Sequence, residues 1–524
     1  MSLGRACGIA LVGLNGYIVD VEADIGGGLP GFVLLGLPDA SLAEARDRIR
    51  AAARNSGLPL SPRRITVNLL PASVPKRGSS LDLSIVVAAL AAAGDIRNPA
   101  DAVHIAELGL DGCLRPVAGV LPSVMAAVAA GRGRIVVAKE NEAEASLVPG
   151  ADVRGYRHLA EVLAAYGGDP QSLTSRWGRA SVAVSAPRSG APGSAEWGGL
   201  PATAPDMADI VGQQEARYAL EVAAAGGHHL LMKGPPGAGK TMLAERLPGI
   251  LPDLTDTEAM ETTAIHSLLR NDRSLESLVR RPPFESPHHS ASMVALIGGG
   301  SGMPRPGAAS RAHRGVLFLD EAPEFAVKAL DSLRQPLESG RLTLHRAAGS
   351  ATYPARFQLV LAANPCPCGL STGKGIDCTC TPMQRRRYFE RLSGPLLDRI
   401  DLQISVPRVA AAQLRADQTT ESSTSVALRV AAARARQQDR LAVLGFARNA
   451  DLPGSVLRGA LSLPPGVTAG ADADVDRGRL TARGYDRVLR IAWTVADLAS
   501  HDSPDAQDVD VALQLRQQTK GEAA

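Results

Sequence analysis

The chain lacks three features that would reveal its setting: a long hydrophobic run, a strong excess of one charge, and many cysteines. Its longest apolar stretches, such as 85–93, are too short to cross a bilayer, so no membrane partner is expected. The net charge of +3 is too small to argue for nucleic-acid binding from composition. The first residues lack the basic-then-apolar layout of an export signal. We therefore expect a cytoplasmic protein whose six cysteines form no disulfides.

A length of 524 residues leaves room for about three domains, and 45% apolar and 21% charged residues are ordinary for a soluble protein. Strands alternate with helices over 1–168, which predicts a first domain. Residues 169–205 are rich in Ala, Pro, Ser and Gly and predict a linker. The motifs described below lie in 206–405, and residues 406–524 have a helical pattern.

The sequence from 230 to 241 joins a short apolar strand, a glycine-rich turn and the start of a helix. Glycines in the turn permit positive φ, so that backbone N–H groups can point inward at phosphate oxygens. Lys240 would reach the β- and γ-phosphates of ATP, and Thr241 would ligate Mg²⁺. The predicted ATP-binding loop consists of Gly234, Pro235, Pro236, Gly237, Ala238, Gly239, Lys240 and Thr241.

Two later strands end in polar residues that suit the same chemistry. The apolar run 315–319 is followed by Asp320, which can hold Mg²⁺ through water, and by Glu321, which can polarise the attacking water. Alone, this segment would be a buried strand with a solvated acidic turn, but its place about 80 residues after the loop favours a catalytic role. The strand 357–364 ends in Asn364, whose amide can orient water against the γ-phosphate.

A cysteine cluster follows Asn364. Four thiolates on one short loop could bind a structural Zn²⁺ tetrahedrally, although C-x-C is not the usual zinc-knuckle spacing. Reduced, metal-free thiols are the alternative. The four residues are Cys366, Cys368, Cys378 and Cys380.

Two further stretches combine small and basic residues, which suits a phosphate backbone that is gripped without base recognition. The first is the glycine-rich segment 290–302 with its basic continuation, and the second is a predicted hairpin over 341–356. Solvated surface loops are the alternative. The candidate DNA contacts are Arg305, Arg311, Arg314 and Arg346.

The N-terminal segments 75–82 (P-K-R-G-S-S-L-D) and 114–123 (L-R-P-V-A-G-V-L-P-S) resemble the proteolytic domain of Lon-type proteases. Ser80 falls near the position of the nucleophile. Ser123 occupies the position of the paired lysine, and without that base the hydroxyl cannot be activated. We predict a Lon-like domain without protease activity.

The order of the later motifs, together with 338–346 (E-S-G-R-L-T-L-H-R) and 396–400 (L-L-D-R-I), resembles the magnesium-chelatase branch of AAA+ ATPases. The whole chain is similar to the YifB/ComM family of Mg-chelatase-like ATPases. This resemblance implies an α/β multidomain fold, with a Lon-protease-like α+β N-terminal domain, a P-loop AAA+ αβα core with a parallel sheet, and a C-terminal helical lid.

The resemblance also implies roles that the residues alone do not give. Arg399 would be the arginine finger that acts on a neighbouring subunit's nucleotide, and Arg483 would be the sensor-2 arginine. The chain would form a hexameric ring and act on single-stranded or branched DNA, as ComM-type branch-migration motors do. A protein-remodelling or metal-insertion ATPase is the main alternative, and an ATP-dependent protease is a weaker one.

Overall fold

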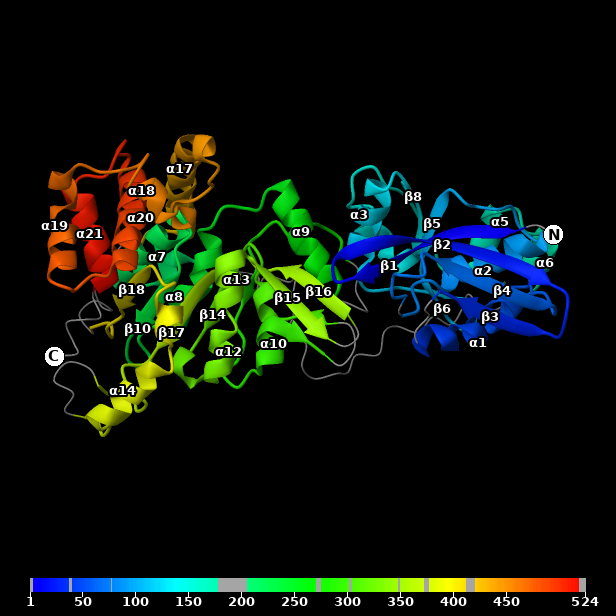
Figure 1. The fold of residues 1–524 in the computed structure, drawn as a ribbon, viewed down its shortest axis with the longest axis horizontal. Coiled ribbons are helices and arrows are strands. Elements are labelled where there is room, and N and C mark those ends of the chain that lie inside the picture. The colour runs from blue at the N-terminus through cyan, green and yellow to red at the C-terminus, as the bar shows by residue number, and fades with distance from the viewer. Residues whose placement is uncertain are drawn as a thin grey trace.

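The structure is a computed structural model that describes residues 3–36, 40–76, 78–177, 205–269, 275–300, 304–346, 349–371, 377–410 and 420–517. Three bodies follow one another along its longest axis, as Figure 1 shows: an N-terminal domain, a central α/β domain and a C-terminal helical domain. Among the described residues, no helix has the length and apolar character needed to span a membrane. Most of the predicted linker, from residue 178 to 204, lies outside the described residues.

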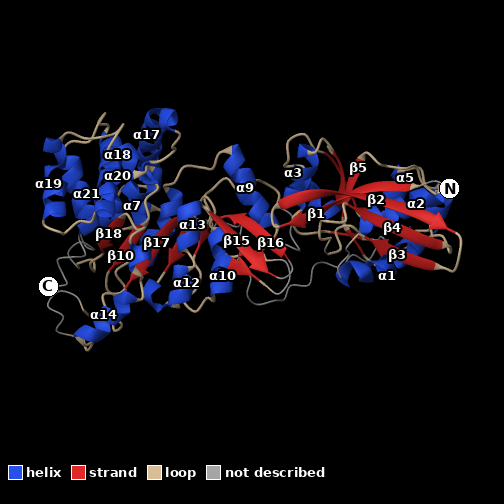
Figure 2. Ribbon diagram, in the orientation of Figure 1, coloured by secondary structure: helices blue, strands red, loops and turns tan. Residues whose placement is uncertain are grey.

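The N-terminal domain is built on a mixed seven-stranded sheet in the order β3-β4-β2-β1-β5-β8-β9. Its strands are β1 (Gly4–Val12), β2 (Asn15–Gly26), β3 (Gly31–Leu35), β4 (Arg64–Leu70), β5 (Ala102–Ile105), β8 (Arg134–Ala138) and β9 (Asp152–Tyr156), with a small hairpin of β6 (Glu107–Leu108) and β7 (Leu114–Arg115). Its helices are α1 (Ala40–Asn55), α2 (Asp82–Ala93), α3 (Val120–Ala129), α4 (Glu142–Ala145), α5 (Leu159–Ala165) and α6 (Pro170–Trp177). The alternation of strands and helices predicted for this region is present (Figure 2).

Helix α2 forms the centre of this domain, because it is apolar on every side and almost completely buried. It packs on β1 and β2 and ends at Gly94, which has a φ of +82°. The domain also extends beyond its predicted end at residue 168. Helix α6 begins at Pro170, and Leu173 is buried in the same hydrophobic core. The start of the predicted linker is therefore structured, because one apolar side chain fixes it to the domain.

The central domain contains a five-stranded parallel sheet in the order β11-β14-β17-β10-β18. The strands are β10 (Leu230–Lys233), β11 (Phe284–Glu285), β14 (Val316–Leu319), β17 (Gln358–Ala363) and β18 (Leu402–Ser405). The helices are α7 (Gln214–Gly226), α8 (Lys240–Arg246), α9 (Asp256–Ser267), α10 (Met293–Ile297), α11 (Ala308–Arg311), α12 (Val327–Asp331), α13 (Arg334–Ser339), α14 (Pro382–Glu390) and α15 (Gly394–Leu397). β14 and β17 are fully buried, as expected for parallel strands that are covered on both faces.

Two antiparallel strand pairs project from this sheet. One joins β12 (Gly298–Gly299) to β13 (Arg305–Pro306), and the other joins β15 (Arg341–Arg346) to β16 (Gly349–Pro354). The second pair confirms the hairpin predicted over 341–356. The residues at its tip, 347 and 348, lie outside the described part of the chain.

The C-terminal domain is helical, as predicted, and packs against α7. Its helices are α17 (Ser423–Leu441), α18 (Gly454–Leu457), α19 (Pro465–Asp476), α20 (Ala482–Ala499) and α21 (Ala506–Gln517). A buried polar chain fixes it to the sheet. His228, which precedes β10, approaches Asp401 at 3.3 Å and Thr494 of α20 at 2.8 Å.

The N-terminal domain contacts the central domain through α9 and the β15–β16 hairpin, which lie between the two bodies in Figure 1. The amide of Gly119 donates to the carbonyl of Ser267 at 3.0 Å. On the hairpin, Leu344 and Tyr353 are buried in a cluster that includes Leu14 of the N-terminal domain. The interface therefore has a hydrogen-bonded part and an apolar part.

Candidate nucleotide site

The parallel sheet brings the three predicted nucleotide motifs to one edge. The glycine-rich loop follows β10, the pair Asp320–Glu321 follows β14, and Asn364 follows β17. Because these strands are parallel neighbours, their carboxyl ends lie side by side, where α/β sheets usually bind ligands. The structure thus assembles residues that lie more than a hundred positions apart in the sequence.

The glycine-rich loop has the backbone that its glycines predict. Gly237 and Gly239 have φ values of +74° and +86°. A Cβ on Gly234 would lie 2.2 Å from the carbonyl oxygen of Val406, so only glycine fits there. Helix α8 then begins at Lys240 and directs its N-terminal N–H groups toward the loop.

Lys240 connects the loop to the strand that ends in Asn364. Its Nζ donates to the carbonyls of Gly234 at 2.6 Å and Pro235 at 3.0 Å, and to Oδ1 of Asn364 at 3.1 Å. Burial lowers the pKa of Lys240, and the nearby carboxylates of Asp320 and Glu321 oppose this effect. The ammonium group is therefore held where the predicted phosphate-binding residues converge.

Thr241 and Asp320 also meet, because the Thr241 hydroxyl donates to Oδ2 of Asp320 at 2.6 Å. A hydroxyl and a carboxylate oxygen are the hard donors that Mg²⁺ prefers, so this pair fits the predicted magnesium site. The next residue, Glu321, has a φ of +49°, a left-handed conformation that is costly for a non-glycine residue and recurs at functional sites. Its amide donates to Oδ1 of Asp320 at 2.9 Å, which fixes the turn.

Two residues that the sequence did not single out join this site. Nδ1 of His289 lies 3.4 Å from Oε2 of Glu321. Nε2 of Gln213 donates to the carbonyl of Ala238 in the glycine-rich loop at 2.5 Å. Gln213 belongs to the V-G-Q-Q segment 211–214, which was a visible signal, whereas nothing local distinguishes His289 from its neighbour His288.

Arg399 lies at the opposite edge of the sheet. It precedes β18, and Leu402 of β18 pairs with Leu230, at the start of β10 rather than beside the loop. Arg399 forms an ion pair with Glu338 and donates to the carbonyl of Pro395. Burial and neighbouring arginines lower its pKa. Because the sheet separates Arg399 from the glycine-rich loop, it does not belong to the nucleotide site of its own chain.

Arg483 lies beside Arg399. Its guanidinium pairs with Asp398 at 3.2 Å, one residue before Arg399, and its side chain is 76% exposed. The two arginines predicted to contact phosphate therefore share one face of the molecule.

The four cysteines of the cluster come together. Their Sγ atoms all lie within 4.8 Å of one another, and the Cys366 sulfur is 3.3 Å from that of Cys368 and 3.7 Å from that of Cys378. Tetrahedral zinc with its usual Zn–S bonds would space the sulfurs about 3.8 Å apart, so the residues fit this metal. The Leu370 amide is the main cause that lowers the pKa of Cys368 to about 6, which favours the thiolate at that residue, whereas burial raises the pKa of Cys366.

The cysteine loop touches the nucleotide site. A Cβ on Gly369 would lie 2.6 Å from two ring carbons of Pro236 in the glycine-rich loop. Phe389 of α14 stacks under the ammonium of Lys233 at 4.8 Å. The cluster is therefore packed against the phosphate end of the site.

The four candidate DNA contacts fall into two pairs. Arg311 pairs with Glu285 at 3.0 Å, and Arg314 pairs with Glu258 at 2.9 Å, so internal carboxylates already hold these two. Arg305 and Arg346 are exposed. Both converge on the glycine-rich segment, since Gly299 pairs with Arg305 and a Cβ on Gly299 would lie 3.0 Å from Nη2 of Arg346.

In the Lon-like region, Ser123 is buried and its hydroxyl donates to the carbonyl of Gly119 at 2.7 Å. Lys76 is also buried, but its ammonium donates to the Pro71 carbonyl. Within the described residues, no hydrogen bond joins Ser80 to a lysine or a histidine. Among the described residues, Ser80 therefore has no lysine or histidine that could act as its base.

The strand order and the three motifs at its carboxyl edge define a P-loop ATPase core of the AAA+ type. Comparison with known proteins gives the same class. The family model for magnesium chelatase, subunit ChlI, matches residues 206–414. A second model, for subunit ChlI of Mg-chelatase, matches residues 21–141, and a third, for the C-terminal region of ChlI, matches residues 420–516. The chain belongs to the YifB/ComM family of Mg-chelatase-like proteins.

The relatives that support this assignment are similar over nearly their whole length. The chain is 41% identical to YifB of Escherichia coli, over 98% of this chain and 97% of that one. It is 41% identical to the competence protein ComM of Haemophilus influenzae, over 95% and 94% of the two chains. An uncharacterized protein of Mycobacterium tuberculosis is 48% identical over 99% of both chains.

Proposed function

We propose that this protein is a Mg²⁺-dependent ATPase that forms a six-membered ring and moves DNA through it. The observation that carries this proposal is the convergence of Lys240, Asn364, Thr241 and Asp320 at one edge of the sheet. Lys240 and the glycine-rich loop supply a phosphate-binding site, and Thr241 and Asp320 supply oxygen atoms for a divalent cation. Glu321 adds a carboxylate next to this cation site. That combination is the machinery of phosphoryl transfer to water.

In this mechanism, the glycine-rich loop and Lys240 bind the β- and γ-phosphates and neutralise their charge. Thr241 and Asp320 would hold Mg²⁺, which supplies further charge neutralisation at the phosphates when bound. Glu321 accepts a proton from the attacking water, and Asn364 orients that water. His289, whose Nδ1 lies 3.4 Å from Oε2 of Glu321, would help to orient that carboxylate.

The position of Arg399 supports assembly into a ring. In one chain, the sheet separates this residue from the P-loop, so it reaches phosphate only when a second chain presents its nucleotide. An arginine that completes the site from a neighbour makes hydrolysis depend on assembly. Arg483, paired with the adjacent Asp398, would act at the same boundary.

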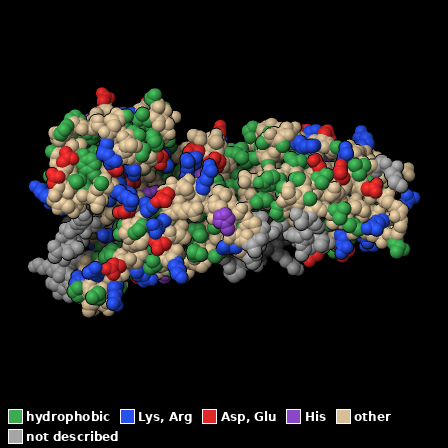
Figure 3. All heavy atoms as spheres, viewed as in Figure 1, with side chains coloured by type: hydrophobic (Ala, Val, Ile, Leu, Met, Phe, Trp, Pro, Cys, Tyr) green, Lys and Arg blue, Asp and Glu red, His purple; other side chains and the backbone are tan. Residues whose placement is uncertain are grey.

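DNA is the favoured substrate because Arg305 and Arg346 are exposed and converge on the β12–β13 strand pair. Acidic and basic side chains are mixed over the face shown in Figure 3, so DNA contact would be local to these loops. The similarity to ComM, a competence protein, supports the same assignment. If DNA is the substrate, we expect the protein to lie in the cytoplasm, where chromosomal DNA is found.

A protein-remodelling or metal-insertion ATPase is the second candidate, because all three matching family models are described by a magnesium-chelatase subunit. The N-terminal domain would act without proteolysis in either case. We also propose that the cysteine cluster binds one structural Zn²⁺, for which the spacing of its sulfur atoms provides support.

The experiment that separates the candidates is an ATPase assay with and without forked and four-way-junction DNA, and with an unfolded protein such as casein. Stimulation by DNA alone supports the DNA motor, and stimulation by protein alone supports the remodeller. If purified protein hydrolyses no ATP in the presence of Mg²⁺, the proposal is wrong.

A further inference from the structure

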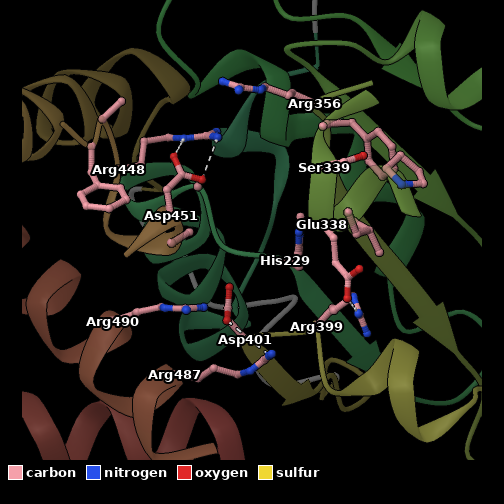
Figure 4. A pocket seen from close by; sticks show the side chains of 18 of the residues that line it. His229, Glu338, Ser339, Arg356, Arg399, Asp401, Arg448, Asp451, Arg487 and Arg490 are labelled. Atoms are coloured by element: carbon pink, nitrogen blue, oxygen red, sulfur yellow. Dashed lines mark hydrogen bonds and ion pairs between the residues drawn. The ribbon is translucent and has the colours of Figure 1, made fainter. Parts of the chain in front are cut away.

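A second pocket, with no P-loop residue in its lining, lies between the central and helical domains. It has a volume of about 440 Å³. The central domain contributes His229, Arg356 and Arg399, and α20 of the helical domain contributes Arg487 and Arg490 (Figure 4). Pockets at domain boundaries are common ligand sites, and this volume falls in the range of small-molecule sites.

The pocket has an excess of positive charge. Five arginines line it, namely Arg356, Arg399, Arg448, Arg487 and Arg490, against three carboxylates, those of Glu338, Asp401 and Asp451. Burial lowers the pKa of His229 to about 4, so this side chain is neutral and does not change the balance. Excess guanidinium groups in a partly enclosed space create a potential that attracts anions.

Part of this charge is unpaired. Glu338 holds Arg399 and Asp451 holds Arg448, but no carboxylate of the described chain forms an ion pair with Arg356 or Arg490. Among the described residues, the Arg490 side chain donates only to a backbone carbonyl, that of Leu452, at 2.7 Å.

The Nε atoms of two of these arginines also lack an acceptor among the described residues. Arg487 is 9% exposed, and its Nε makes no hydrogen bond with the described residues. The Nε of Arg399, whose side chain is 18% exposed, makes no such hydrogen bond either. Buried polar groups in folded proteins are nearly always satisfied, so these N–H groups indicate a missing acceptor. Burial is the main cause that lowers the pKa values of Arg399 and Arg487, and repulsion from neighbouring arginines adds to it, which a bound anion would relieve.

The pocket is preformed. Arg356 lies against Gly340, where a Cβ would come within 2.6 Å of its Cγ, so the glycine makes room for the arginine. Arg487 is held by Asp401 at 3.7 Å. Figure 4 shows Arg487 and Arg490 on one side of the pocket and Arg356 and Arg399 on others, so the arginines surround its interior.

We propose that this pocket binds a polyphosphate chain, with Arg356 and Arg490 as its free cationic contacts. Guanidinium groups approaching from several directions match the many oxygens of a di- or triphosphate. Two sources present this chemistry: a free polyphosphate in solution, or the triphosphate of ATP held by the P-loop of a second copy. The second source rests on the proposed function, and the first does not.

The test uses the full chain with Lys240→Ala, which disables the P-loop, titrated with sodium tripolyphosphate in a calorimeter at low ionic strength. The expected result is one site per chain, weakened about tenfold or more by Arg490→Gln or Arg356→Gln, the loss typical of a charged hydrogen bond. Arg477→Gln is the matched control, because Arg477 is exposed and lies outside the pocket. Arg490→Gln also removes the hydrogen bond to the Leu452 carbonyl and could therefore disturb folding. Arg356→Gln removes no such bond among the described residues and tests the pocket without that risk.

The neighbour's nucleotide is tested in a second arm, with the Glu321→Gln chain and ATP. If the pocket receives that triphosphate alone, Lys240→Ala binds no tripolyphosphate, while Arg490→Gln and Arg356→Gln weaken ATP-dependent assembly in analytical ultracentrifugation. Arg477→Gln leaves assembly unchanged. Tripolyphosphate binding and assembly that are both insensitive to Arg356 and Arg490 would overturn the proposal. Failure of ATP hydrolysis in the wild type would leave the calorimetric arm intact.

Discussion

Arg483 and Asp398 form an ion pair of 3.2 Å directly before Arg399, at the sheet edge opposite the P-loop. The sequence placed Arg399 and Arg483 in separate motifs, 84 positions apart. In the proposed ring, a neighbouring subunit's nucleotide would meet both of them, because they lie on one face.

Arg399→Ala should leave ATP affinity nearly unchanged and abolish turnover, because its own P-loop is intact while the charge donated to the neighbour is lost. The loss of a finger arginine costs about 10³-fold or more in rate. Mixing Arg399→Ala with Glu321→Gln should restore activity, because some boundaries then pair an intact P-loop with an intact arginine. No recovery at any mixing ratio would argue against action between subunits.

Glu321→Gln should bind ATP and accumulate assembled rings, because the amide keeps the shape of the side chain but accepts no proton. Fluorescent-nucleotide binding and a phosphate-release assay measure the two properties separately. Lys240→Ala is the contrasting variant and should lose affinity, because its Nζ lies at the centre of the phosphate cradle. Wild-type phosphate release by Glu321→Gln would show that another group is the base.

Replacing Cys366, Cys368, Cys378 and Cys380 with serine should remove one zinc per chain, as measured by elemental analysis. It should also weaken ATP binding, because the cysteine loop supports Pro236 through Gly369. Cys113→Ser is the control, since Cys113 lies outside the cluster and should leave the zinc content unchanged. Carefully purified wild type without zinc would end the metal hypothesis.

Arg305→Ala and Arg346→Ala should weaken DNA binding without reducing ATP hydrolysis in the absence of DNA. Each neutralised phosphate contributes roughly −0.7 to −0.9 to the log–log salt slope. Each substitution should therefore reduce the magnitude of that slope by about one unit, equally on unrelated DNA sequences. Fluorescence anisotropy at several salt concentrations measures this, with Arg477→Ala as the control. An unchanged salt slope in the double variant would show that Arg305 and Arg346 do not contact DNA.

Local patterns in the sequence predicted much of the nucleotide edge. The loop 234–241, the acidic pair after β14 and Asn364 each follow an apolar strand, and parallel pairing then brings strand ends together. The hairpin over 341–356 and the helices of the C-terminal domain were also predictable, because each is encoded by a local pattern of residues.

The rest depends on contacts between distant segments. Strand β1 was not predicted, and α6 was taken for linker, because its burial depends on Leu173 finding the N-terminal core. The arginine pocket draws residues from α20, the β18 turn and the end of β16, none of which carries a motif for it. Likewise, only folding shows that Arg311 and Arg314 are occupied by Glu285 and Glu258.

The N-terminal domain is attached to α9 and the β15–β16 hairpin, so a movement of these elements in the proposed motor would also move the domain. Leu344 and Tyr353 are buried on the side of the hairpin where Leu14 packs, so the hairpin and the domain are one body at that point. If the hairpin shifts during the proposed ATP cycle, a domain of roughly 170 residues shifts with it. The Lon-like domain would then move with the hairpin, and a partner bound to that domain would be moved by ATP hydrolysis at a distant site.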